Sequence, residues 1–210
     1  YMIMAAAKAG GIIANSSNQK DFFLENIEIQ NSLLKLSELK KIKRTIFLGT
    51  SCIYPKFAKT PIKEESLLTG SLEKTNQSYA IAKIAGIKLC EALYEDHKLD
   101  VVCLMPTNVY GKNDNFDKVN GHVIPSVISK IELAKKKNYS KVTLWGTGRP
   151  LREFIHSDDL ANAILTCLKV KKSVYQKKFK SRLPILNVGT KHIISIKQLS
   201  KLIAKYIDYK

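Results

Sequence analysis

The chain has 210 residues, and 45% of them are hydrophobic, which is enough for the core of one α/β domain or of one domain and part of another. Its longest clean apolar stretches, such as residues 101–106, have the length of a strand and not of a membrane span, and its first residues do not predict a secretion signal. The four cysteines are scattered without Cys-x-x-Cys spacing, which argues against a zinc site or a disulfide framework. We therefore expect a cytoplasmic protein with no metal site and no membrane contact.

The formal net charge of +17 raises the question of nucleic-acid binding. Of the 35 basic residues, 31 are lysines spread along the chain, and the densest group, residues 169–180, contains no recognisable DNA- or RNA-binding module. A solvated, lysine-rich surface accounts for this pattern, so we expect no nucleic-acid partner. The alternative, a basic nucleic-acid-binding domain, would require binding to RNA or DNA that survives physiological salt.

Apolar strands and amphipathic helices alternate along the first half of the chain. Residues 1–11 are typical of a buried strand that runs into a loop, and residues 18–42 carry apolar side chains at helical spacing. A short strand at 45–49 ends in a hydroxyl-rich turn, and a loop is expected at 55–75. A second long helix at 78–99 and a strand at 100–105, stopped by Pro106, complete this half. The alternation predicts a doubly wound, Rossmann-like α/β fold with a parallel sheet covered on both faces.

The pattern loosens after Gly111. The elements expected there are helices at 124–137, 158–170 and 195–207, and strands at 141–145, 153–156 and 186–189. This half is expected to build part of a smaller substrate-binding lobe beside the parallel sheet.

The sequence lacks the glycine-rich turn that a dinucleotide-binding sheet presents after its first strand. The ten glycines never form Gly-x-Gly-x-x-Gly or the related Gly-x-x-Gly-x-x-Gly, and Gly10-Gly11 is the nearest approach. Either the protein is not a dinucleotide enzyme, or the chain is a fragment that starts after this turn. A non-Met start in the middle of a strand favours the fragment.

Tyr79 and Lys83 lie one helical turn apart, on the same face of the second long helix. A lysine ammonium beside a phenol favours the phenolate and is expected to lower the pKa of the phenol, which helps it to pass a proton to a carbonyl. Thr50, at the end of the preceding strand, offers a hydroxyl to the same carbonyl oxygen. This set without metal ligands suits hydride transfer from an organic cofactor.

Six ordered segments resemble those of the GDP-L-fucose synthases, a group of extended short-chain dehydrogenase/reductases. They are Leu48–Lys56, Thr75–Gly86, Met105–Gly111, Asp114–Phe116, His122–Pro125 and Trp145–His156. The resemblance implies that residues 1–111 are the C-terminal part of an NADP-binding Rossmann domain. It implies that residues 112–210 contain segments of the substrate-binding lobe together with elements in which the chain returns to the Rossmann domain. An N-terminal glycine-rich unit and a C-terminal stretch would lie outside this chain.

The resemblance also implies roles for individual residues. Tyr79 would donate a proton during ketone reduction, Lys83 would bind the nicotinamide ribose, and Thr50 would replace the usual serine. Cys52 and His122 would be the acid/base pair acting at C3 and C5 of the sugar. The binding site of the cofactor NADP(H) would be lined by Leu48, Gly49, Thr50, Ser51, Tyr79, Lys83, Pro106, Thr107, Asn108, Val109 and His122. Lys130, Trp145 and Arg152 would contact the GDP-sugar substrate.

Simple chemistry supports Cys52 more directly than His122. Two residues after Thr50 in an extended chain, the thiol would point to the same side as the hydroxyl, and it titrates close enough to neutrality to exchange an activated proton. His122 alone, in a polar loop before a helix, would suggest capping or surface exposure. Its catalytic role rests on the resemblance. His156, which follows a strand, is expected to be structural.

The residues after Thr50 help to choose among related activities. Sugar-nucleotide 4,6-dehydratases resemble one another in an acidic pair there, whereas this chain has Ser51 and Cys52. UDP-hexose 4-epimerases would leave Cys52 and His122 unused. The expected activity is conversion of GDP-4-keto-6-deoxy-D-mannose to GDP-L-fucose by 3,5-epimerisation and NADPH-dependent 4-keto reduction, in a homodimer. Another NAD(P)-dependent nucleotide-sugar epimerase or dehydratase, or an inactive binding fragment, remains an alternative.

Overall fold

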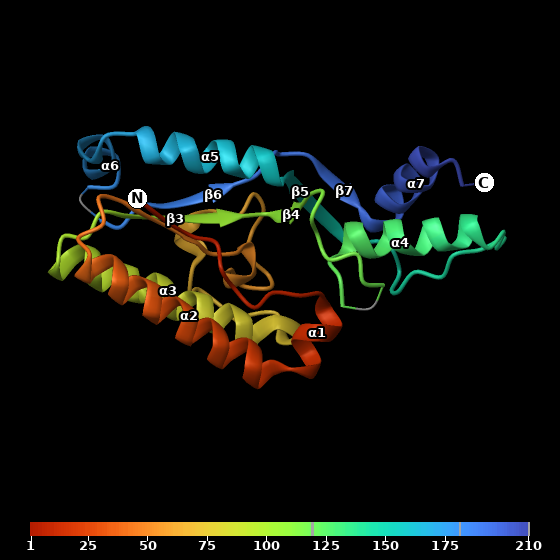
Figure 1. The fold of residues 1–210 in the computed structure, drawn as a ribbon, viewed down its shortest axis with the longest axis horizontal. Coiled ribbons are helices and arrows are strands. Elements are labelled where there is room, and N and C mark those ends of the chain that lie inside the picture. Colours follow the sequence, from red (N-terminus) through yellow and green to blue (C-terminus); the bar gives the residue numbers. More distant parts are fainter. Residues whose placement is uncertain (119, 181, 210) are drawn as a thin grey trace.

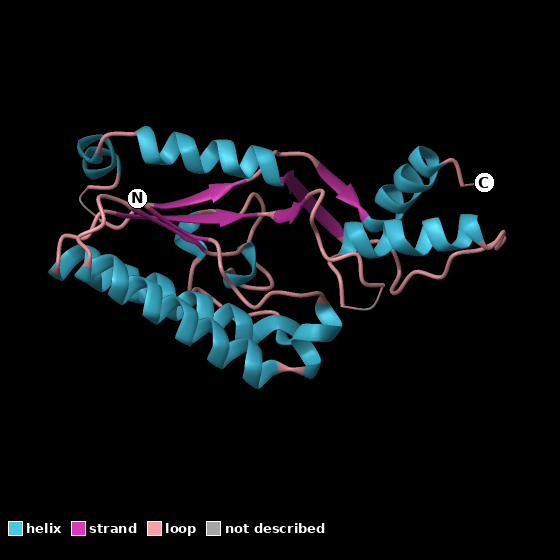
Figure 2. Ribbon diagram, in the orientation of Figure 1, coloured by secondary structure: helices cyan, strands magenta, loops and turns pink. Residues whose placement is uncertain are grey.

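A four-stranded parallel sheet forms the centre of the molecule. The computed structural model describes residues 1–118, 120–180 and 182–209. Strands β1 (Met2–Met4), β2 (Thr45–Leu48), β3 (Val101–Pro106) and β6 (Ile185–Val188) lie side by side in the order β1-β2-β3-β6, all parallel. Helices cover both faces of the sheet, as Figures 1 and 2 show. The prediction of a Rossmann-like α/β fold is confirmed.

Alternating side chains of β2 and β3 divide the core into two layers. Phe47 and Cys103 point to the face covered by α2 (Gln19–Leu39) and α3 (Gln77–Asp96), and both belong to the largest apolar cluster. Ile46 and Leu104 point to the opposite face, under α5 (Ser157–Lys169) and α6 (Lys172–Lys178). All four side chains are at most 1% exposed. Strands buried on both faces explain why these segments appear as continuous apolar runs.

Helices α2 and α3 pack closely together at Gly86. A Cβ built there would lie 2.5 Å from Oε1 of Gln30 and 2.6 Å from the ring of Phe47. Gln30 is 2% exposed, and its amide nitrogen donates to the carbonyl of Ala82, one turn earlier in α3, at 2.7 Å. A buried glycine and a buried amide therefore set the distance of α3, the helix that carries Tyr79 and Lys83, from its neighbours.

Gly86→Ala is expected to lower the free energy of unfolding by about 1–3 kcal/mol, because the added methyl group overpacks this contact. The loss should appear in urea denaturation as a lower midpoint with an unchanged slope. Ala85→Gly, at the exposed neighbouring position, measures helix propensity alone and should cost about 1 kcal/mol. A Gly86→Ala protein that is more stable than the wild type would show that α2 and α3 can separate at no cost.

A second, three-stranded sheet continues from the carboxyl end of β3. Its strands are β4 (Asn108–Tyr110), β5 (Leu151–His156) and β7 (Ile193–Ser195), with β4 parallel and β7 antiparallel to β5. Helices α4 (Val123–Lys136) and α7 (Ile196–Ile207) pack together with this sheet around a third apolar cluster. Figure 1 shows this part at the opposite end of the molecule from α6.

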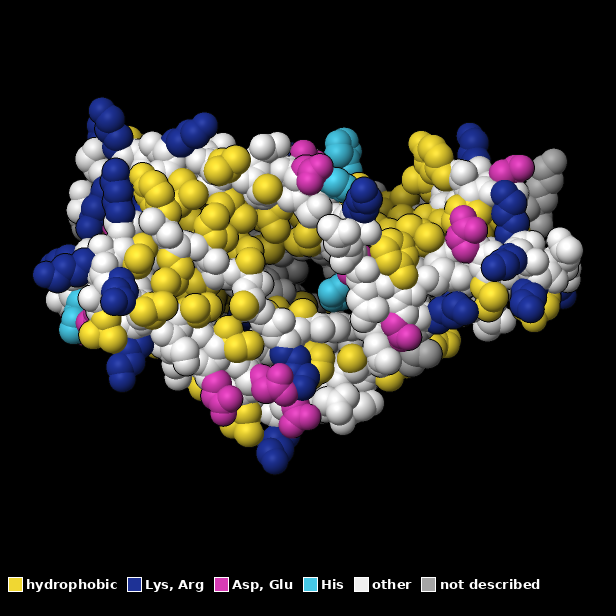
Figure 3. Space-filling view, in the orientation of Figure 1, with side chains coloured by type: hydrophobic (Ala, Val, Ile, Leu, Met, Phe, Trp, Pro, Cys, Tyr) yellow, Lys and Arg dark blue, Asp and Glu magenta, His cyan; other side chains and the backbone are white. Residues whose placement is uncertain are grey.

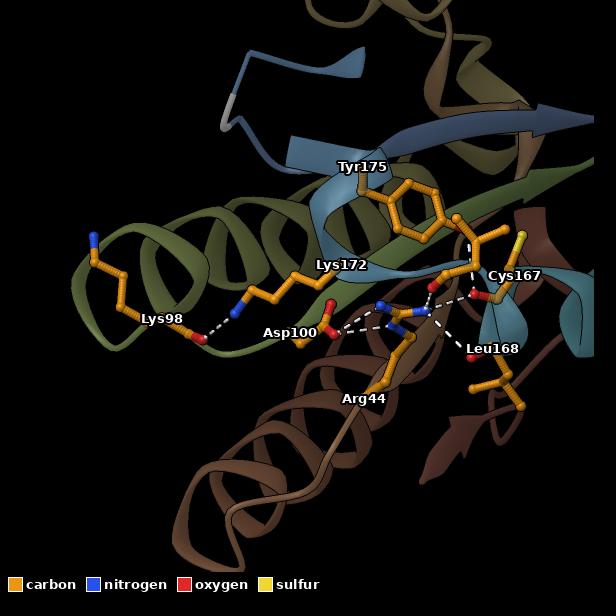
Figure 4. Close-up of polar contacts among 8 residues, drawn as sticks. Arg44, Lys98, Asp100, Cys167, Leu168, Lys172 and Tyr175 are labelled. Atoms are coloured by element: carbon orange, nitrogen blue, oxygen red, sulfur yellow. Dashed lines mark hydrogen bonds and ion pairs between the residues drawn. The ribbon is translucent and has the colours of Figure 1, made fainter. Parts of the chain in front are cut away.

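Arg44 joins several elements at the amino end of the main sheet (Figure 4). Its Nε and Nη2 donate to Oδ2 of Asp100 at 3.0 and 2.9 Å. Its Nη1 donates to three carbonyls at the end of α5, those of Cys167 at 2.9 Å, Leu168 at 3.3 Å and Val170. The guanidinium is therefore the cation that satisfies the last carbonyls of α5.

All five expected helices and five of the six expected strands form. The expected strand at 141–145 is wrong: these residues form an irregular segment without a ladder partner in the described part of the chain. Its alternation instead lets Val142 and Leu144 pack on the third cluster. The short elements that were not expected are β4, β7, α6 and α1 (Ile12–Ser17). Each has three to seven residues, too few to establish a period.

Candidate active site

Thr50 and Cys52 lie directly after β2, at the carboxyl end of the parallel sheet. Residues Ser51–Ile53 form a single 3₁₀ turn, and Oγ1 of Thr50 caps it by accepting a hydrogen bond from the Cys52 amide at 3.3 Å. The expectation of an extended chain here is wrong, because the hydroxyl offers the backbone this turn. The side chains still meet, because Thr50 hydrogen-bonds the Cys52 thiol. Burial raises the pKa of that thiol above its ordinary value, and the Thr50 hydrogen bond and the positive charge of Arg152 offset only part of this rise. The expectation that the thiol titrates close to neutrality is therefore wrong for this structure.

Tyr79 stands in the first turn of α3, beside this thiol. Burial raises the pKa of its phenol, and the nearby charge of ionised Cys52 raises it further. Its ring meets Phe22 of α2 edge to face, with centroids 6.4 Å apart and planes at 83°. The phenol is therefore held from one side by an apolar wall and faces the thiol on another. It stays protonated through neutral pH.

Lys83 lies one turn further along α3 and is 4% exposed. Its Nζ donates to the carbonyl of Leu48 at 3.0 Å and lies 5.2 Å from the centroid of the Phe47 ring. Burial lowers the pKa of this ammonium to about 8, and the charge of Cys90 opposes that change. Lys83 thus anchors the end of β2 to α3 and exchanges its proton close to neutral pH.

The prediction that Lys83 lowers the pKa of Tyr79 is wrong for this structure. Desolvation dominates both groups, so it favours the neutral phenol and the neutral amine. The ammonium is also directed at the Leu48 carbonyl. At neutral pH the site therefore holds a protonated phenol at Tyr79 and an ammonium at Lys83 that loses its proton more readily than an ordinary lysine does.

His122 occupies a different position, at the N-cap of α4. Its Nδ1 lies 3.5 Å from Oδ1 of Asp114, and the imidazole is 46% exposed. Within the described residues no hydrogen bond or ion pair joins His122 to Cys52 or Tyr79. Figure 3 shows that the molecule is hollowed near its centre. The catalytic pairing of His122 with Cys52 stays a prediction.

The residues expected to line the cofactor gather at the carboxyl ends of β2 and β3, where ligands of open parallel sheets bind. Gly49 has no room for a side chain, since a Cβ would lie 2.3 Å from the sulfur of Met105. The amide of Thr107 donates to Val188 at 3.0 Å, but its Oγ1 is buried without a hydrogen-bond partner among the described residues. The expected residues found at these strand ends and in the adjoining turn and β4 are Leu48, Gly49, Thr50, Ser51, Pro106, Thr107, Asn108 and Val109.

The three expected substrate residues divide into two groups. Nζ of Lys130, on α4, lies 4.1 Å from the ring centroid of Trp145, whose side chain is 56% exposed. Arg152, on β5, lies near enough to Cys52 to lower its pKa. Arg152 therefore lies in the same part of the site as the Cys52 thiol and Tyr79. Lys130 and Trp145 form a separate surface on the second part of the molecule.

Two further residues complete the description. His156 is structural as expected, because its Nδ1 accepts a hydrogen bond from the Asp158 amide at 3.3 Å and caps α5. Asp114 lies in one of the resembling segments, and the resemblance implies no role for it. The signal that could have identified it is a carboxylate in the same loop as a candidate catalytic histidine, eight residues before it.

Comparison with known proteins identifies the family of the chain. A sequence model described as the NAD dependent epimerase/dehydratase family matches residues 1–189. The chain belongs to this family. The epimerase/dehydratase chain is 44% identical to a probable GDP-L-fucose synthase 1 of Oryza sativa over 210 residues, which is all of this chain and 61% of that protein. It is 43% identical to the GDP-L-fucose synthase of Escherichia coli, covering 99% of this chain and 64% of the relative.

A solved structure extends the similarity to three dimensions. The GDP-D-glycero-L-gluco-heptose synthase of Campylobacter jejuni, determined in the presence of NADPH, matches 99% of this epimerase/dehydratase chain and 70% of its own, with a TM-score of 0.87 and 31% identity. The chain spans about three fifths of the length of the curated relatives it matches. Within the described residues, no helix is both long and apolar enough to cross a membrane.

Proposed function

We propose that this protein is a GDP-L-fucose synthase that uses NADP(H). The observation that carries the proposal is the meeting of the Cys52 thiol, the Tyr79 phenol and the Thr50 hydroxyl at the carboxyl end of β2. A thiol at this place, followed by no carboxylic acid, suits proton exchange next to a ketone better than dehydration. The similarity to plant and bacterial GDP-L-fucose synthases at 43–44% identity supports the same substrate.

The residues of the chain fit the nicotinamide end of a dinucleotide. Lys83 presents an ammonium at the end of β2, where its Nζ donates to the Leu48 carbonyl, and the hydroxyl of Thr107, without a hydrogen-bond partner among the described residues, lies at the end of β3. NADPH, when bound, supplies the hydride for C4. Lys83 would hold the nicotinamide ribose, and the strand-end backbone would orient the ring.

The protein's own groups then divide the chemistry. Thr50 and Tyr79 donate hydrogen bonds to the C4 ketone of GDP-4-keto-6-deoxy-D-mannose, which stabilises enolates formed at C3 and C5. Cys52 and His122 exchange the protons at these carbons, and Arg152 favours the thiolate state of Cys52. During reduction, Tyr79 gives its phenolic proton to the C4 oxygen. Lys130 and Trp145 would bind the GDP part.

The proposal includes an assembly and a location. Exposed apolar side chains on α2 and α3, namely Leu24, Leu36, Leu39 and Ile81, are 40–68% exposed and suit a homodimer interface. The protein is expected to act in the cytoplasm, where its free cysteines stay reduced.

Cys52→Ser is expected to slow epimerisation by about 10²-fold or more and the 4-keto reduction far less. Serine keeps the shape of the side chain but is a far weaker base at neutral pH. Epimerisation is measured as the incorporation of deuterium from heavy water at C3 and C5 of the sugar. Reduction is measured as NADPH oxidation with a substrate ketone that is already epimerised. Cys167→Ser makes the same chemical change on α5 and should alter neither rate. Equal losses of both steps in Cys52→Ser would contradict the proposed role of the thiol.

A further inference from the structure

The loop before α4 holds a carboxylate against the imidazole of His122. Oδ1 of Asp114 lies 3.5 Å from Nδ1 of His122, and a shift of about 0.5 Å would bring the two atoms to an ordinary hydrogen-bond distance. The side chain of Asp114 is only 15% exposed. A carboxylate that is largely removed from water needs a donor, and the imidazole Nδ1–H is a suitable one.

The backbone around this pair fixes both partners. The Asn115 amide donates to Oδ1 of Asp114 at 2.7 Å, which orients the carboxylate. Gly121 is packed so tightly that a Cβ would lie 2.4 Å from the carbonyls of Asn115 and Asp117. In the described residues, the His122 side chain makes no capping hydrogen bond to α4, although His122 is the N-cap residue. The imidazole is therefore available to Asp114.

Asp114 also borders a pocket of about 320 Å³ between the second sheet and α4. Its walls include the apolar side chains of Phe116, Ile124 and Ile128. The charged or titratable groups on the same walls are Lys112, Tyr110 and His156, and Nδ1 of His156 is already used at the start of α5. These apolar walls on one side of Asp114 lower the local dielectric constant, which reduces the screening of the attraction between Asp114 and His122.

We infer that Asp114 is a positioning residue for His122: it retains the proton on Nδ1 and thereby leaves Nε2 to exchange a proton with the sugar. The inference rests on the proposed function for its consequence in catalysis, but not for its geometry. The imidazole can hold only one tautomer against a carboxylate, because a carboxylate accepts and cannot donate. Without Asp114, Nε2 would carry the proton in part of the molecules and could not act as a base.

The direct test is nitrogen NMR of the protein labelled with ¹⁵N-histidine at about pH 8.5, where imidazoles are neutral. His122 should carry its proton mainly on Nδ1 in the wild type and shift towards Nε2–H in Asp114→Asn. Asp158→Asn is the matched control, because Oδ2 of Asp158 lies 3.6 Å from Nδ1 of His156 and its side chain is 84% exposed. It should leave the His122 signals unchanged. The same His122 tautomer in wild type and Asp114→Asn would overturn the inference.

Kinetics separate this inference from the proposed function. Asp114→Asn should lower the His122-dependent hydrogen exchange at the sugar by about 10²-fold, with reduction of an epimerised ketone changed less than twofold. Asp158→Asn should change neither rate. If the tautomer shifts in Asp114→Asn and exchange does not slow, the positioning role is supported and the proposed proton transfer by His122 is overturned.

Discussion

Arg44→Met is expected to lower the free energy of unfolding by about 3–5 kcal/mol, the cost of breaking a buried ion pair from one side. Arg44 is 4% exposed, and its guanidinium lies between Asp100 and the end of α5 (Figure 4). Methionine fills a similar volume but donates no hydrogen bond. The carboxylate of Asp100, 13% exposed, would be left without its cation.

The loss of stability in Arg44→Met should extend beyond the ion pair with Asp100. Three carbonyls at the end of α5 accept from Nη1 of Arg44, and the ring of Tyr175, on α6, lies 5.2 Å from its guanidinium carbon. Hydrogen exchange should therefore show earlier opening of α5 and α6 than of α2 and α3. Urea denaturation measures the total loss.

Lys43→Met is the control for Arg44→Met. It removes one positive charge from the neighbouring residue, whose exposed side chain contacts the ring of Tyr1 at 5.5 Å. Such a surface change should cost less than about 0.5 kcal/mol. If Arg44→Met lost no more than Lys43→Met, the guanidinium would not be the cap of α5.

The parts of the fold that sequence analysis predicts are those with long periodic patterns. Helices at 18–42 and 78–99 were expected, and α2 and α3 occupy nearly the same ranges. The strand at 45–49 was recognised because both of its faces are buried, which makes it an apolar run. The strand expected at 141–145 fails because alternation reports only which side chains are buried, not whether a second strand lies alongside.

The site was predicted partly by chemistry and partly by resemblance. Spacing alone places Tyr79 and Lys83 on one face of α3, and this holds. The sign of the change in the pKa of Tyr79 could not be predicted, since it depends on desolvation and on the direction of the Lys83 ammonium. The effect of the Arg152 charge on Cys52, and the closeness of Asp114 to His122, join separate segments whose distance only the folded chain defines.

Tyr79→Phe is expected to lower the rate of 4-keto reduction by about 10²–10⁴-fold, because the variant cannot supply a proton to the C4 oxygen. Burial raises the pKa of this phenol, so the wild-type group is fully protonated at neutral pH and remains a donor up to its ordinary value and beyond. The phenylalanine ring can keep the edge-to-face contact with Phe22, so stability should change little.

The pH dependence distinguishes Tyr79 from Lys83. As pH rises through about 8, Lys83 loses its ammonium charge while Tyr79 stays protonated, so a fall in NADPH affinity over this range belongs to Lys83. NADPH binding to Tyr79→Phe should therefore keep the wild-type pH profile although reduction is slow. The same phenol-to-phenyl change at Tyr206, which is 84% exposed, should leave both properties intact. A Tyr79→Phe protein that reduced the ketone within tenfold of the wild-type rate would show that another group, with Thr50 as the nearest candidate, delivers the proton.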